Sequence, residues 1–172
     1  MPSGKVHDQI TLVGAVAAVP VWWYLSPSPA DWHIGVTLVV ATLFAGWLLS
    51  PDLDLDSSIY KRWGPLRFLW YPYQKMVPHR SWISHSWLLS PLMRVGYLLI
   101  MTWLMAWLTL WGIRQASGLG PGVPETTPWD LVQTLYRDYP KHTLMALVGL
   151  FFGTALHTGA DTIFSGLKRR RR

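Results

Sequence analysis

Four stretches of about twenty residues carry no Asp, Glu, Lys or Arg, and these stretches constrain the fold more than any other feature of the chain. They cover residues 9–30, 32–51, 95–113 and 142–160. A helix needs about 20 apolar residues to cross the hydrocarbon core of a bilayer. We therefore predict an all-α fold, in which a four-helix transmembrane bundle forms a single integral-membrane domain over residues 1–172. The predicted spans lie at roughly 9–26, 33–50, 87–113 and 142–164.

The composition agrees with a membrane protein. Hydrophobic residues make up 51% of the chain, 12 residues are Trp, and only 14% are charged, whereas a soluble domain usually carries about 25% charged residues. A water-soluble helical protein with buried helices is the alternative. The chain has no cysteine, so disulfides and thiolate ligands are excluded, and any metal must be held by His nitrogen and carboxylate oxygen.

The basic residues gather on one side of the predicted spans. That side carries Lys5, Lys61, Arg62, Arg67, Lys75, Arg80 and the basic tail 168–172. Arg94 adds to it, because we expect this side chain to snorkel from the start of the third span toward the headgroups. The other side carries Arg114, Arg137 and Lys141. Since cytoplasmic loops are rich in Lys and Arg, we predict that both termini lie in the cytoplasm.

The two longer connections are predicted to hold short interfacial helices. The connection over residues 57–78 mixes basic and aromatic residues, a composition that can bind single-stranded nucleic acid or the headgroups of membrane lipids. Its place between two spans favours lipids, so we expect no nucleic-acid partner. In the other connection, Thr127 is expected to cap a helix that begins at Pro128 and has Asp130 in its first turn.

Histidine and aspartate side chains lie beside the basic ends of the predicted spans. The candidate metal ligands are His7, Asp52, Asp54, His79, His85, His157 and Asp161. If the spans cross a membrane, all seven gather at its cytoplasmic face. His33 and His142 fall at the opposite face, and we interpret them as ordinary interfacial residues.

Two of these groups carry a local signal. Asp52 and Asp54, with Asp56, alternate with leucines, and in an extended strip such carboxylates point the same way. His157 and Asp161 are four residues apart, which places them on one face of a helix. The plain alternatives are a solvated acidic loop and a private hydrogen bond between a histidine and an aspartate. A shared metal ion accounts for both groups together.

The order of these motifs resembles a family of uncharacterised, metal-binding bacterial membrane proteins, which is similar in turn to the membrane-bound metal-dependent hydrolases. The segments that carry the resemblance are Met1–Asp8, Ser50–Ser57, Tyr60–Arg67, Val77–His85 and the late His157 and Asp161. The resemblance implies that the seven residues named above bind the metal, and that the membrane is a bacterial inner membrane.

The leading hypothesis for the function is a metal-dependent hydrolase acting on a phosphoester or ester of a lipid-like substrate. The metal would be divalent, with zinc first and Mn, Fe or Mg as alternatives, and one or two ions are compatible with seven ligands. Asp54 and His85 are the candidate general bases, and Arg80 is the candidate for stabilising an anionic transition state. The second hypothesis is a non-catalytic protein in which the ion is structural or sensed. A third is a small adaptor that binds anionic lipid or a partner through the basic connection. The oligomeric state stays open.

Overall fold

The computed structural model describes residues 4–25, 28–77, 86, 89–118 and 127–170. Within these residues the chain forms seven α-helices, three 3₁₀-helices and no strand, so the all-α prediction is confirmed. In chain order the elements are α1 (Gly4–Leu25), η1 (Pro29–Asp31), α2 (Trp32–Trp47), η2 (Pro51–Asp54), α3 (Ser58–Arg62), η3 (Gly64–Trp70), α4 (Tyr71–Met76), α6 (Leu89–Ala116), α7 (Pro128–Asp138) and α8 (Pro140–Arg170).

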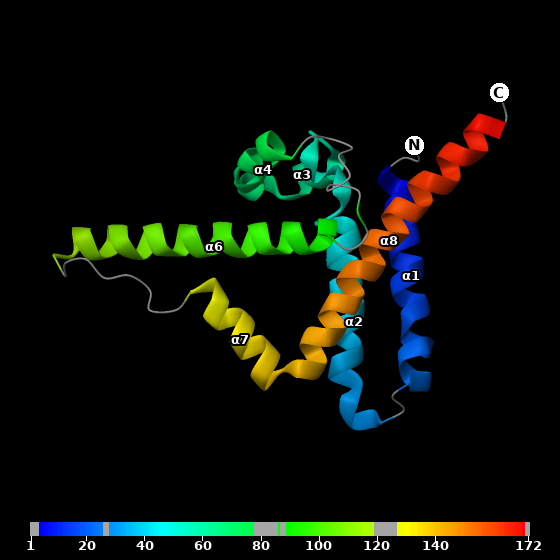
Figure 1. The fold of residues 1–172 in the computed structure, drawn as a ribbon, viewed down its shortest axis with the longest axis horizontal. Coiled ribbons are helices and arrows are strands. Elements are labelled where there is room, and N and C mark those ends of the chain that lie inside the picture. The colour runs from blue at the N-terminus through cyan, green and yellow to red at the C-terminus, as the bar shows by residue number, and fades with distance from the viewer. Residues whose placement is uncertain (1–3, 26–27, 78–85, 87–88, 119–126, 171–172) are drawn as a thin grey trace.

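Helices α1, α2 and α8 pack against one another and form the three-helix group that carries the site (Figure 1). Helices α2 and α8 run in the same direction and α1 runs the opposite way. The start of α1 and the ends of α2 and α8 therefore point toward one end of the group, which we call the site end. The start of α2 and the start of α8 lie at the other end, which we call the far end.

Glycines in α8 allow it to lie against the backbone of α2. A Cβ atom at Gly149 would stand 2.6 Å from the carbonyl oxygen of Leu38, and one at Gly153 would stand 2.5 Å from that of Thr42. Any larger residue would therefore force the two helices apart. Two glycines four residues apart at a helix contact are typical of close packing between helices in membranes, where small residues let the backbones approach.

Helix α6 does not run alongside the three-helix group but extends away from it (Figure 1). Of the described helices, α6 and the segment Pro140–Phe164 of α8 are long and apolar enough to cross a membrane. Helix α2 is apolar but has only 16 residues, which is about 24 Å of helix against a hydrocarbon core of about 30 Å. The predicted four-span bundle is therefore not confirmed.

The distribution of apolar residues around α6 explains why the sequence did not predict that this helix extends away from the other three. Apolar side chains lie on every side of this helix, and most of them are exposed in the structure. Burial is confined to its first turns, at Ser90, Pro91 and Arg94. A helix that is apolar all round presents no single stripe that would specify which neighbour it packs against.

The connection between α2 and α6 forms a cap over the site end. Its elements η2, α3, η3 and α4 surround a buried cluster made of Leu49, Leu53, Ile59, Trp70, Tyr73 and Val77. Side chains from the start of α6 pack on this cluster, including Val95 and Leu98. The predicted short helices in this connection are thus present in the structure.

The acidic motif is not an extended strip, and that expectation is wrong. Residues Pro51–Asp54 form a 3₁₀-helix, because Ser50 caps its start and Pro51 occupies its first position. The hydroxyl oxygen of Ser50 accepts a hydrogen bond from the amide nitrogen of Asp52 at 3.3 Å. As a result the three acids separate: Asp54 is buried, Asp52 is half-buried and Asp56 is exposed.

The predicted cap of α7 is confirmed. Thr127 accepts a hydrogen bond from the amide of Asp130, and the Asp130 carboxylate accepts hydrogen bonds from the amide and hydroxyl of Thr127. These bonds hold the pKa of Asp130 below its ordinary value. Trp129, Leu131 and Tyr136 are exposed on this short helix.

Candidate metal centre

Three of the predicted ligands meet between the first and the last helix. Each of His7 on α1 and His157 and Asp161 on α8 offers one ligand atom, and these atoms all lie within 4.8 Å of one another. The Nε2 atom of His7 is 3.3 Å from one carboxylate oxygen of Asp161, and the Nε2 atom of His157 is 3.7 Å from the other. The two imidazole rings stack with centroids 4.0 Å apart and an interplanar angle of 20°.

The start of η2 adds two more side chains to this group. The Nε2 atom of His157 lies 3.5 Å from a carboxylate oxygen of Asp52 and 3.3 Å from the hydroxyl oxygen of Ser50. The turn that Ser50 initiates therefore also presents Asp52 to the histidine. Residues from α1, η2 and α8 thus converge on one point at the site end.

Burial determines the electrostatics of this group. His7 is 5% exposed and His157 is 1% exposed. Burial, followed by the nearby His157 imidazole, lowers the pKa of His7 below its ordinary value, while Asp161 and Asp52 oppose that shift. A neutral imidazole is the form that binds metals, so the site favours the state of His7 that a ligand requires.

The donor set and its spacing fit a divalent metal ion. A tetrahedral ion with bonds of 2.0–2.2 Å holds its donor atoms about 3.4 Å apart, close to the 3.3 and 3.7 Å between the histidine and carboxylate atoms here. The Nδ1 atoms of both histidines are buried and have no hydrogen-bond partner among the described residues. Two imidazoles with one carboxylate are donors that suit zinc and iron.

An ion pair holds the start of α1 in place. The guanidinium of Arg62, on α3, donates to both carboxylate oxygens of Asp8 at 2.8 and 2.5 Å, and also to the carbonyl oxygen of Trp47. The indole of Trp47 donates to the backbone oxygen of Asp8 at 3.3 Å. Because Asp8 adjoins His7, these bonds fix the position of a candidate ligand. Arg62, predicted only as a basic lipid-facing residue, therefore has this structural role.

Among the described residues, the group whose ligand atoms lie within 4.8 Å of one another does not include Asp54 or Asp56. Asp54 is buried in η2 on the side of Tyr73 and Arg94, whose charges it influences. Asp56 is exposed and pairs with Lys61 at 3.4 Å. His79, Arg80 and His85 lie outside the described residues.

Sequence reasoning missed the structural roles of two buried residues, Ser50 and Arg94. A lone serine is not typical of a metal site, so the sequence did not point to Ser50. Its hydroxyl caps η2 and also lies 3.3 Å from the Nε2 atom of His157. Arg94 was expected to snorkel, and that expectation is wrong, because its side chain is fully buried. The signal was available: a single arginine in an otherwise apolar span usually has a function and a partner inside the fold.

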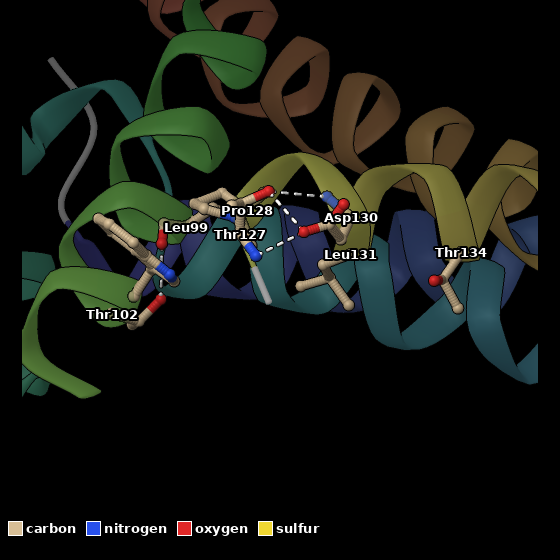
Figure 2. A pocket seen from close by; sticks show the side chains of 8 residues that line it. Leu99, Thr102, Thr127, Pro128, Asp130, Leu131 and Thr134 are labelled. Carbon is tan, nitrogen blue, oxygen red and sulfur yellow. Dashed lines mark hydrogen bonds between the residues drawn. The ribbon is translucent and has the colours of Figure 1, made fainter. Parts of the chain in front are cut away.

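A separate cavity of about 390 Å³ lies between α6 and α7. Figure 2 shows its lining, which includes Leu99, Thr102, Pro128 and the hydrogen-bonded pair Thr127 and Asp130. Asp130 is the carboxylate of this lining, and the cap of α7 already engages it. This cavity is therefore lined mainly by apolar groups and hydroxyls, and it does not include the residues of the metal centre.

Comparison with known proteins agrees with the donor set. No solved structure matches the chain. A protein of Aquifex aeolicus (strain VF5), named only as an uncharacterized protein, is 40% identical over 73 residues. That alignment covers 41% of this chain and 48% of the relative, so the chain spans about half the length of the relative that it matches. A family profile described as "Uncharacterized metal-binding protein (DUF2227)" matches residues 2–171.

Proposed function

Because the chain belongs to the family of uncharacterized metal-binding proteins DUF2227, we propose that it holds one divalent metal ion between His7, His157 and Asp161. The observation that carries this proposal is the convergence of two buried histidines and a partly buried aspartate, from α1 and α8, whose ligand atoms lie within 4.8 Å of one another. Asp52 completes the set as a fourth ligand or as the group that orients His157. Zinc is our first choice of metal, with iron, manganese and magnesium as alternatives. The alternative is a second ion with His79 or His85 among its ligands.

We place the protein in the bacterial inner membrane, with the site end toward the cytoplasm. The apolar α6 and α8 support a membrane location, as do the close glycine contacts between α8 and α2. The excess of Lys and Arg in the residues of the site end supports this orientation. We retain four spans as the proposed topology, with α6 packing in the bilayer differently from the other three helices. Membrane lipids are then the immediate partners of the exposed apolar side chains.

The activity we propose is hydrolysis of a phosphoester or ester in a lipid-like substrate. When bound, a divalent ion supplies Lewis acidity and acidifies water, which makes hydrolysis feasible at neutral pH. Among the described residues, Asp52 is better placed than Asp54 to accept a proton, because Asp52 lies 3.5 Å from His157. His7 on α1 and His157 on α8 would hold the ion from two different helices. Similarity in motif order to the membrane-bound metal-dependent hydrolases supports this choice.

One observation favours a structural role as the alternative. The candidate ligands join α1 to α8, the first and last helices of the described chain, and η2 contributes Asp52. An ion at this point would stabilise the fold whether or not it catalysed a reaction. The two roles differ in what metal removal does: a structural ion changes the unfolding temperature alone, and a catalytic ion changes hydrolysis as well.

The test is metal analysis of the full chain purified in detergent, by mass spectrometry, for the unsubstituted protein, Asp161→Ala and the control Asp138→Ala. Asp138 lies on the exposed α7, away from the centre. We expect about one ion per chain in the unsubstituted protein and the control, and a loss of about tenfold or more in Asp161→Ala. Hydrolysis of nitrophenyl phosphodiester and ester substrates should fall with the metal content.

An unsubstituted protein that contains no divalent metal would contradict the proposed function. A metal-loaded protein that hydrolyses neither substrate class, but unfolds at a lower temperature after chelation, would contradict the hydrolase and favour the structural ion.

A further inference from the structure

Arg94 is a fully buried cation whose hydrogen-bonding capacity is only partly used. Its side chain is 0% exposed. The Nε atom donates to the carbonyl oxygen of Ser90 at 3.1 Å, and the Nη2 atom donates to the Ser90 hydroxyl oxygen. The Nη1 atom is buried and has no hydrogen-bond partner among the described residues. A buried donor without an acceptor destabilises the fold, so its retention calls for an explanation.

The surroundings of Arg94 connect it to the metal centre. Asp54, Asp52 and the Tyr73 hydroxyl act on its charge from η2 and α4. Asp52 is shared between the two places, because one of its oxygens lies 3.5 Å from the Nε2 atom of His157. Helix α6 begins where it meets the three-helix group (Figure 1), and Arg94 is one of the buried residues in its first turns.

A guanidinium is suited to binding an oxyanion. It presents planar N–H groups that pair with two oxygens of a phosphate or carboxylate at once. In Arg94 the Ser90 contacts fix the Nε and Nη2 side of this plane, which leaves Nη1 as the donor that has no partner in the described chain. Burial strengthens such a bond, because the surrounding dielectric constant is low.

We propose that Arg94 is the anion-binding residue of the metal centre, and that it pairs with the phosphate group of a ligand held beside His157 and Asp52. This inference rests on the proposed function, since the ligand occupies the proposed metal centre, and it narrows that ligand from a phosphoester or ester to one that carries a phosphate group. Free phosphate and the headgroup of a phosphomonoester lipid present the same chemistry. A role confined to neutralising Asp54 is the competing explanation, and it requires no ligand.

The test measures binding of two probes to the metal-loaded full chain in detergent by isothermal titration calorimetry. The probes are inorganic phosphate and short-chain phosphatidic acid, and the control is short-chain phosphatidylcholine, whose zwitterionic headgroup has no phosphomonoester. The variants are Arg94→Gln and Arg94→Lys, and Arg67→Gln on the exposed surface of η3 is the matched control. Metal content is measured on every sample before titration.

We expect Arg94→Gln to keep its metal and to weaken phosphate binding about tenfold or more. Arg94→Lys should retain an intermediate affinity, because lysine keeps the charge but lacks the planar fork. Arg67→Gln should bind as the unsubstituted protein does. Binding of phosphatidic acid but not of inorganic phosphate would identify a lipid headgroup as the ligand. Binding of inorganic phosphate but not of phosphatidic acid would identify free phosphate. Either result supports the inference if the binding is weakened in Arg94→Gln.

Three results would overturn the inference while leaving the proposed metal site intact. The first is a metal-loaded unsubstituted protein that binds neither phosphate probe. The second is unchanged affinity in Arg94→Gln, or in Arg94→Lys if the glutamine variant does not fold. The third is a parallel loss of metal and phosphate binding in Arg94→Lys, which would assign Arg94 to charge neutralisation. An unsubstituted protein without metal would instead overturn the proposed function, and this inference with it.

Discussion

Two stacked pairs of histidines stand at the two ends of the three-helix group, and α8 contributes one histidine to each. At the site end, His7 and His157 stack with centroids 4.0 Å apart. At the far end, His33 on α2 and His142 on α8 stack with centroids 4.9 Å apart and an interplanar angle of 29°. In both pairs the two imidazole rings are therefore stacked in a similar way.

The surroundings of the two pairs differ in the features that make a metal site. The pair at the site end is buried and faces the carboxylates of Asp161 and Asp52.

At the far end, His33 is exposed, and the rings of Trp32 and Tyr139 lie against the pair. The nearby Asp31 pairs with Lys141 at 3.8 Å. Two imidazoles in contact therefore do not define a metal centre. Carboxylates that face the imidazoles, together with exclusion of water, make the difference.

The largest expected difference between the two ends appears when one histidine of each pair is removed. We expect His157→Ala to lower metal affinity by about a hundredfold or more, because even groups that only orient ligands contribute 10–100-fold. We expect His142→Ala to leave the metal content unchanged. Mass spectrometry of the metal in both purified variants is the measurement. Equal losses in the two variants would show that the comparison is wrong.

A smaller effect should separate the aspartates of the two ends. Asp52→Asn keeps the shape of the side chain but removes the charge that faces His157, so metal affinity should fall by about 10–100-fold. Asp31→Asn at the far end removes the charge that pairs with Lys141 and should not change metal affinity. Competition with a chromophoric chelator gives both affinities. An Asp52→Asn protein that competes as well as the unsubstituted chain would remove Asp52 from the centre.

The third prediction concerns the contact between α2 and α8, the two helices that run from the far end to the site end. In Gly153→Ala the new Cβ atom would stand 2.5 Å from the carbonyl oxygen of Thr42, which is too close for two unbonded atoms. We expect the resulting strain to lower the free energy of unfolding by about 1–3 kcal/mol. Gly159→Ala is the control on the same helix, because a Cβ there has no neighbour within 4 Å. Thermal unfolding in detergent compares the two. A Gly153→Ala protein as stable as Gly159→Ala would mean that the close contact does not contribute to the fold.

The parts of the site that could be predicted are those that are local in sequence. His157 and Asp161 share a helix face because the helix repeats every 3.6 residues, and the cap formed by Thr127 and Asp130 follows from residue types three positions apart. His7 was identified by its place beside an apolar stretch and by the resemblance to a metal-binding family. The membership of Asp52 was predicted too, but for a reason that the structure corrects, since η2 is a 3₁₀-helix.

The sequence by itself determined the helical character of the described residues and a donor set without thiolate, because helix periodicity, apolar length and the absence of cysteine are properties of the covalent chain. Only the tertiary structure decided that Asp52 rather than Asp54 faces His157, that Arg94 is buried, and that α6 leaves the three-helix group. Each of these outcomes depends on contacts between segments far apart in sequence. The contacts depend in turn on how closely the glycines of α8 let α2 approach and on how Ser50 turns the chain, and no local pattern specifies the result.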